Sequence, residues 1–160
     1  MSIEKVSITT SRRPIWRFPP AYFLAALVLS LLLGSYVPLV PFGSSTSLIM
    51  AVLLFLAAVT IFLLSVAQFR RAKTTLRPFE PSSALLTTGP YRISRNPIYL
   101  AMTLVLISLA LGLGNLTPLF LPVLFTLTID RLFVRHEERM LVASFGVQYE
   151  DYCARVRRWL

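Results

Sequence analysis

The chain has 160 residues, which suits one domain, and 56% of them are hydrophobic against only 14% charged. Soluble domains are about 45–50% apolar, so this composition favours an integral membrane protein over a soluble one. A single cysteine excludes an intrachain disulfide and a tetrathiolate zinc site, and the net charge of +9 indicates a membrane surface rather than nucleic acid because of where it lies along the chain.

Four apolar stretches reach or approach the length of about 20 residues that crosses a membrane as a helix. None carries a charge before Asp130, as expected from the roughly 2.5–3.5 kcal/mol cost of a charge at the bilayer centre. The pattern predicts an all-α polytopic membrane helical bundle, one integral membrane domain over residues 1–160, with about four transmembrane helices. In chain order the expected spans are Ala21–Val40, Leu48–Ala67, Ile98 to about Leu113, and about Leu116 to Phe133.

The connectors predict the orientation of these spans. All 16 Lys and Arg residues lie before the first span, between the second and third, or at and beyond the end of the fourth, whereas connectors 41–46 and 114–117 carry no charge. The positive-inside rule then places both termini in the cytoplasm. We expect a multi-pass protein of a bacterial inner membrane, with a flexible cytoplasmic segment 1–20, a cytoplasmic connector 68–97 and a cytoplasmic helical extension 130–160.

The connector ends in TTGPYRISRNPIYL, residues 87–100. Its Gly-Pro pair is a turn signal, and Asn96 followed by Pro97 is typical of the start of a helix. Tyr91 and Tyr99 suit an aromatic belt at the membrane interface, so a purely structural explanation is open. The free N–H groups in the first turn of that helix equally predict a site for an anionic or polar ligand.

The fourth span continues into a charged helix. Glu137 lies seven residues after Asp130, so α-helical spacing places both on nearly the same face. A neighbouring stripe carries Arg131, Arg135 and Glu138. Ordinary ion pairs on a solvated helix would also explain such a run. However, the short turn after the third span makes the two helices antiparallel neighbours, which predicts that this charged helix and the Gly-Pro-Tyr loop line one cytoplasmic pocket.

The sequence GPYRISRNPIY, followed about 40 residues later by R-x-E-E-x-x-L-x-x-x-F-G-x-x-Y-x-x-Y, resembles the isoprenylcysteine carboxyl methyltransferase family, which is related to the membrane phospholipid N-methyltransferases. The resemblance covers roughly residues 74–160. It implies S-adenosyl-L-methionine as the methyl donor. It also implies a lipophilic or membrane-associated acceptor, such as an isoprenylcysteine-type carboxylate, a thiol or a lipid amine. Membrane lipids are further expected partners; nucleic acid and metal are not expected.

The resemblance also assigns residues. The family's Arg-His-Pro-x-Tyr element has Asn96 where histidine is commonest, and an amide can donate and accept hydrogen bonds but cannot become cationic. An arginine that holds the family's substrate falls near Arg131 and Arg135, and Phe133 takes the aligned place. No residue is required as a covalent catalyst. The implied cofactor-binding residues are Leu85, Leu86, Tyr91, Arg95, Asn96, Pro97, Ile98, Tyr99, Glu137 and Glu138.

Two other functional classes stay open on the sequence. A sterol-reductase-like, NADPH-dependent membrane oxidoreductase has a broadly similar C-terminal half; a basic pocket for the 2′-phosphate would favour it, and the glutamate pair argues against it. A non-catalytic membrane scaffold predicts no cofactor binding. The chain lacks a G-x-G-x-x-G sequence after a strand, so a soluble dinucleotide-binding domain is not expected.

Overall fold

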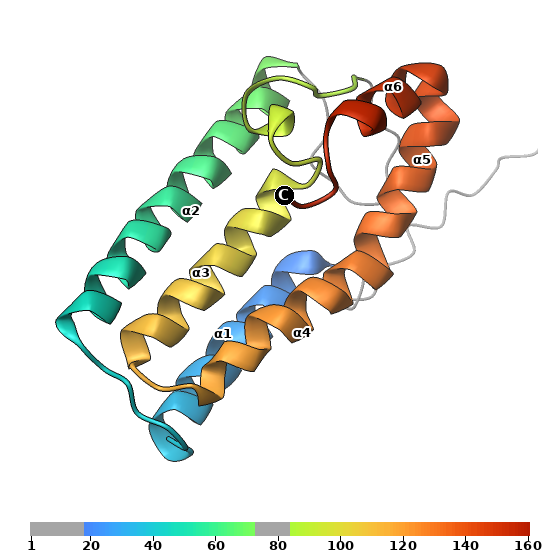
Figure 1. Ribbon diagram of the computed structural model, residues 1–160. Coiled ribbons are helices and arrows are strands. Elements are labelled where there is room, and N and C mark those ends of the chain that lie inside the picture. The colour runs from blue at the N-terminus through green and yellow to red at the C-terminus, as the bar shows by residue number, and fades with distance from the viewer. Residues whose placement is uncertain (1–17, 73–83) are drawn as a thin grey trace, which may run out of the picture.

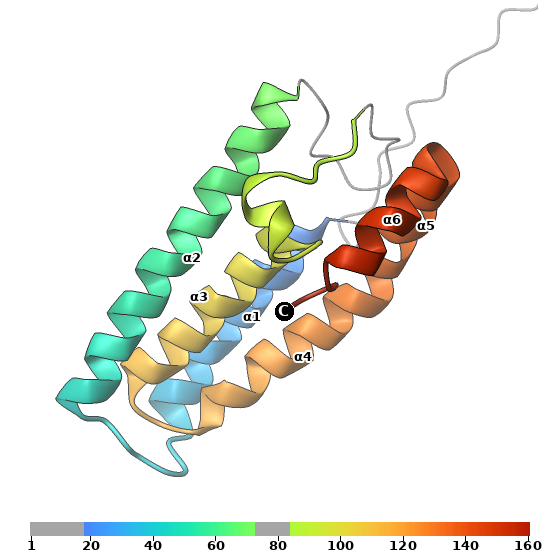
Figure 2. The same ribbon diagram turned by 45° about the horizontal axis from the view of Figure 1, so that its top comes forward.

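The computed structural model describes residues 18–72 and 84–160, and within these ranges the chain is helical without a named strand. Four helices lie side by side, and two more, the first of which continues the fourth, form a hairpin at one end of the bundle (Figures 1 and 2). The prediction of an all-helical fold is therefore confirmed for the described residues. The helices are α1 (Pro19–Tyr36), α2 (Ser45–Arg71), α3 (Pro97–Leu113), α4 (Phe120–Ile129), α5 (Arg135–Phe145) and α6 (Val147–Arg155). Residues 1–17 of the expected N-terminal segment and 73–83 of the expected connector lie outside the described residues.

Three helices in the described ranges are long and apolar enough to cross a membrane: Pro19–Tyr36, Ser45–Arg71 and Thr117–Phe145. The third is continuous from a 3-10 turn through α4, a π-helical turn and α5. The remaining apolar helix, α3, has 17 residues, which is the lower end of the roughly 17–25 residues that span a bilayer. The expected count of four spans stays a prediction.

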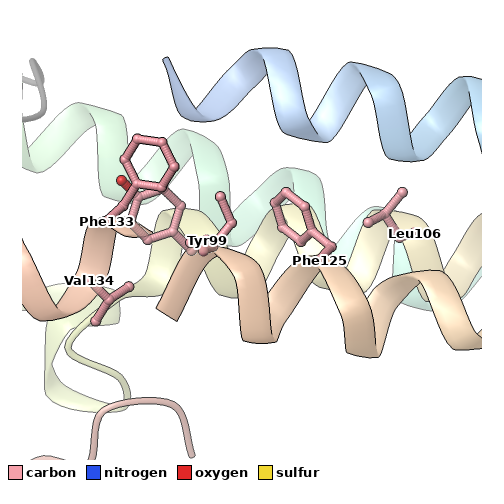
Figure 3. Close-up of a cluster of buried hydrophobic side chains, with 6 residues drawn as sticks. Tyr99, Leu106, Phe125, Phe133 and Val134 are labelled. Atoms are coloured by element: carbon pink, nitrogen blue, oxygen red, sulfur yellow. The ribbon is translucent and has the colours of Figure 1, made fainter. Parts of the chain in front are cut away.

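The packed core lies between α1, α3 and α4. Phe125, Phe133 and Leu106 are each at most 4% exposed and belong to one cluster that also contains Tyr99, Ile129 and Val134 (Figure 3). From α1, the ring of Tyr22 meets Phe133 edge to face, with ring centroids 5.5 Å apart. Most apolar side chains of α2 instead point outward, as expected for a helix whose outer surface faces lipid.

The two uncharged connectors close the end of the bundle away from the α5–α6 hairpin. The N–H of Phe42 donates to the carbonyl of Gly114 at 2.8 Å, and the N–H of Leu116 donates to the carbonyl of Val40 at 3.0 Å. Gly114 ends α3 with a φ of +63°, a conformation that favours glycine, and a Cβ here would lie 2.8 Å from the Cα of Gly43. This tight turn makes α3 and α4 antiparallel neighbours, as predicted (Figure 1).

The helix after α4 changes register at a π-helical turn, Asp130–Val134. A π turn holds more residues than an α turn, so side chains beyond it are rotated relative to regular α-helical spacing. The guanidinium of Arg158 consequently bridges Asp130 and Glu138, whereas Glu137 accepts a hydrogen bond from Tyr99 instead. The prediction that Asp130 and Glu137 share a face was therefore wrong, and Glu138 is the carboxylate that lines up with Asp130.

Candidate functional site

A cavity of about 460 Å³ lies at the end of the bundle that carries the α5–α6 hairpin. Its volume falls within the roughly 300–1,000 Å³ of small-molecule sites. The wall is built from the starts of α1 and α3, the second half of α2, the segment before the Gly-Pro-Tyr loop, and both helices of the hairpin. Most of these side chains are apolar, and a few charged groups and tyrosines converge among them.

All ten residues that the resemblance implies for the cofactor line this one cavity: Leu85, Leu86, Tyr91, Arg95, Asn96, Pro97, Ile98, Tyr99, Glu137 and Glu138. The convergence expected from the α3–α4 hairpin is thus present in the structure, and the binding roles of these residues stay predictions. Arg131 and Arg135 do not line the cavity. They line a second hollow on the other side of Glu138.

Tyr91 and Tyr99 are buried inside the protein, with exposed fractions of 7% and 8%, so the interpretation that they form an interface belt was wrong. The 3-10 turn Gly89–Arg92 turns Tyr91 inward, where its ring lies 6.0 Å from that of Phe69 on α2. Burial, with added repulsion from Tyr152 and Glu137, raises the pKa of the Tyr91 hydroxyl well above its usual value. Tyr91 therefore offers the cavity a neutral hydroxyl at physiological pH.

The start of α3 presents backbone donors to the cavity. Pro97 occupies the first helical position, as predicted, but the side chain of Asn96 makes no capping hydrogen bond. Its amide instead donates to the carbonyl of Arg158 at 3.1 Å. The first N–H groups of an α-helix have no partner within the helix, so those of Ile98 and Tyr99 are available to a ligand at the cavity wall.

The charged groups of the cavity form two sets of contacts, one around Glu137 and one around Glu138. The hydroxyl of Tyr99 donates to Glu137 at 2.7 Å, while Glu138 forms an ion pair with Arg95 at 3.3 Å and accepts a hydrogen bond from Arg158 at 2.5 Å. The hydrogen bonds that Arg158 donates to Glu138 raise the pKa of the Arg158 guanidinium, which keeps it cationic. Arg95 uses its terminal nitrogen for Glu138 and Cys153, and its buried Nε has no hydrogen-bond partner in the described part of the chain.

The segment after α6 belongs to the site, although the sequence predicted it only as part of the helical extension 130–160. Residues 156–160 fold back against the start of α3 (Figure 2), where Arg95 donates its N–H to the carbonyl of Arg157 at 3.0 Å and Ser94 donates its hydroxyl to that of Arg158. Trp159 packs against the core cluster. The sequence of this tail has no helical hydrophobic periodicity, because the backbone is extended rather than helical at Val156. The apolar cavity residues of α2 also carried no signal beyond their hydrophobicity.

Tyr152 supports the Gly-Pro-Tyr loop through its hydroxyl, which is buried and donates to the carbonyl of Tyr91 at 2.7 Å. We expect Tyr152→Phe to lower the free energy of unfolding by about 1 kcal/mol, because a buried carbonyl loses its partner. Thermal unfolding of detergent-purified protein measures the change. Tyr36→Phe, at a side chain that is 80% exposed, is the matched control. Equal effects of the two substitutions would contradict the role assigned to this hydrogen bond.

An apolar helical bundle with a mixed polar and apolar cavity at one end is typical of an integral membrane protein, and the cavity is its candidate small-molecule site. The family model described as phospholipid methyltransferase matches residues 46–148, which is more than half of the chain. The chain belongs to the phospholipid methyltransferase family, and this membership supports a membrane methyltransferase. An uncharacterized protein of Haemophilus influenzae is 36% identical over 63 residues, which are 39% of this chain and the whole of that protein. No solved structure matches the chain.

Proposed function

We propose that this protein moves a methyl group from S-adenosyl-L-methionine to a lipophilic or membrane-associated acceptor. Membership of the phospholipid methyltransferase family supports the class of reaction. The observation that carries the rest is the cavity in which Glu137, Arg95 and the start of α3 converge beside an apolar wall. In this proposal four helices cross the membrane, with the basic end of the bundle in the cytoplasm.

The donor groups of the cavity fit the charges of the methyl donor. Its amino-acid part carries an ammonium, which a carboxylate such as Glu137 would accept, and a carboxylate, which needs donors. The unpaired Nε of Arg95 and the N–H groups of Ile98 and Tyr99 supply such donors. In the described ranges no group of three or more His, Cys, Asp or Glu side chains could hold a metal ion, and the proposal requires none.

An apolar wall faces these polar groups. It consists of Phe18 and Pro19 at the start of α1 and of Phe62, Val66 and Phe69 on α2. Apolar surface of this kind binds the hydrocarbon part of a ligand, because both lose contact with water together. A lipid-linked acceptor would therefore lie against α1 and α2 with its polar end directed to the start of α3.

The work of the protein in this reaction is positioning and exclusion of water. When bound, S-adenosyl-L-methionine supplies an electrophilic methyl group on a cationic sulfur. Glu137 and Arg95 orient the amino-acid part, and the apolar wall holds the acceptor in line. A carboxylate or thiolate acceptor needs no general base at neutral pH, whereas a lipid amine must first lose a proton. No side chain needs to form a covalent intermediate.

Ligand-induced stabilisation tests the proposal. We expect S-adenosylhomocysteine to stabilise the detergent-purified protein by about 2.7 kcal/mol at a hundredfold excess over its dissociation constant, measured by thermal shift or calorimetry. Glu137→Gln should remove most of this gain, because the ligand ammonium loses its carboxylate. Glu150→Gln, at an exposed glutamate on α6, should keep it.

NADPH is titrated alongside. Stabilisation by NADPH alone would contradict the methyltransferase assignment and favour the oxidoreductase of the sterol-reductase type. Stabilisation by neither ligand would favour a non-catalytic scaffold. An acceptor screen with radiolabelled methyl donor then distinguishes a carboxylate acceptor, whose methyl ester is hydrolysed by base, from thiol and amine acceptors, whose methylated products are stable to base.

A further inference from the structure

A second, more open hollow of about 600 Å³ lies beside the cavity. The π-helical turn and α5 form one side of it, and α6 with the C-terminal tail forms the other. Five of the described residues that line it are arginines, and Glu138 is the acidic residue among them. The arginines are Arg95, Arg131, Arg135, Arg139 and Arg158. We call this feature the basic hollow.

The charges of the basic hollow do not balance. Glu138 pairs with Arg95 and Arg158, and Asp130 pairs with Arg135 at 2.9 Å and with Arg158. Five guanidinium groups thus face two carboxylates. Arg131 and Arg139 have no carboxylate within 4.0 Å in residues 18–72 and 84–160; Arg139 donates from its Nε to the backbone carbonyl of Arg135 instead.

Uncompensated positive charge in a concave site attracts an anion. Guanidinium groups favour phosphate among anions, because their planar fork of N–H donors matches two phosphate oxygens at once. The arginines here come from three segments: the corner before α3, the long helix, and the C-terminal tail. Donors that approach from several directions suit a tetrahedral group with several oxygens better than a planar carboxylate.

The position of the basic hollow on the bundle indicates where the phosphate comes from. On the same helix, Leu124 and Leu127 precede the arginines and are 52% and 49% exposed, and Leu132, beside Arg131, is 49% exposed. Along this helix the exposed surface therefore changes from apolar side chains to the guanidinium groups of Arg131 and Arg135. The phosphates of a bilayer lie at this kind of boundary, and basic pockets beside membrane helices bind anionic lipid headgroups.

We infer that the basic hollow binds the phosphate group of an anionic phospholipid, whose acyl chains lie along the exposed apolar face of α4. This site is distinct from the cavity, although Arg95, Glu138 and Tyr149 contribute to the walls of both. The inference goes beyond the proposed function and does not depend on it, because the lipid site is tested without any methyl donor.

Native mass spectrometry of the detergent-purified full chain provides the test. We expect the protein to retain phosphatidylglycerol on the order of tenfold better than phosphatidylcholine, because only the former carries a net negative charge. The double variant Arg131→Gln/Arg139→Gln should lose phosphatidylglycerol by a similar factor. Neither arginine has a carboxylate partner in the described residues, so the fold keeps its ion pairs. Arg92→Gln/Arg155→Gln, at two exposed arginines outside the hollow, is the control and should retain the lipid.

Glycerol 3-phosphate is the competing probe. If it displaces the lipid at comparable concentration, the phosphate chemistry of the hollow is supported and the ligand is a soluble phosphate ester rather than a lipid. If glycerol 3-phosphate does not displace the lipid, the result supports a phospholipid as the ligand of the basic hollow. Equal retention of the two phospholipids, or equal retention of phosphatidylglycerol by the double variant and its control, would overturn the inference. Unfolding temperatures of both variants verify that each is folded.

Discussion

Phe133→Ala is expected to lower the free energy of unfolding by about 3 kcal/mol. The side chain is 1% exposed and belongs to the core cluster (Figure 3), and its ring meets that of Tyr22 edge to face. Truncation leaves a cavity that α1, α3 and α4 cannot close. We place the cost at the low end of the range for phenylalanine because lipid removes part of the driving force for burying apolar surface. Equilibrium unfolding in mixed detergent measures it.

Leu132 provides the matched control for this substitution. It is the preceding residue on the same π-helical turn, but it is 49% exposed. Leu132→Ala should change stability by less than about 0.5 kcal/mol, the usual effect of a surface substitution. Similar losses from the two alanines would show that the core does not lie between α1, α3 and α4.

Arg158→Ala is expected to cost about 2 kcal/mol of unfolding free energy, which is typical of losing hydrogen bonds to charged groups. Its guanidinium donates to both oxygens of Glu138, at 3.0 and 2.5 Å, and lies 3.4 Å from Asp130. Without Arg158, Glu138 keeps Arg95 as its ion-pair partner and Asp130 keeps Arg135. Because Glu138 lines the cavity, we also expect binding of S-adenosylhomocysteine to weaken on the order of tenfold.

Three further variants separate a local role of Arg158 from general damage. Arg155→Ala, at an exposed arginine of α6, should be neutral. Arg158→Lys keeps the charge but not the two-pronged contact, so it should recover only part of the loss. In a double-mutant cycle with Glu138→Gln, the two effects should be strongly non-additive. Additive losses, or a full recovery with lysine, would contradict the bridging geometry.

Features of the fold that rest on local signals could be predicted from the sequence. The apolar runs predicted the helices, and the short turn at Gly114 predicted that α3 and α4 are antiparallel neighbours. Pro97 stands at the first position of α3 because its missing N–H costs nothing there. The convergence of the Gly-Pro-Tyr loop with the glutamate pair followed from that hairpin, since two helices of similar length return to the same depth.

Features that depend on tertiary contacts could not be predicted in this way. Asn96 reads as an N-cap, but its amide goes to the carbonyl of Arg158, 62 residues away in sequence. Tyr91 and Tyr99 look like interface residues because tyrosine is amphipathic, and only packing against Phe69 and Glu137 reveals that they point inward. The C-terminal tail that contains Arg158 has no periodic hydrophobic pattern. Its packing against the start of α3 could therefore not be predicted from the sequence.

The π-helical turn at Asp130–Val134 has a consequence for comparing this chain with its relatives. The wide turn is equivalent to one inserted residue, so a homologue with a regular helix would align with a single-residue gap somewhere in these five positions. An offset counted backward from the glutamate pair across this turn therefore shifts by one residue relative to such a homologue, and the position at which a substrate arginine is sought shifts with it. Superposition of backbones, not sequence offset, identifies the equivalent arginine. Deletion of one residue within the turn would convert it to a regular α-helical turn and leave both glutamates on the faces they occupy now.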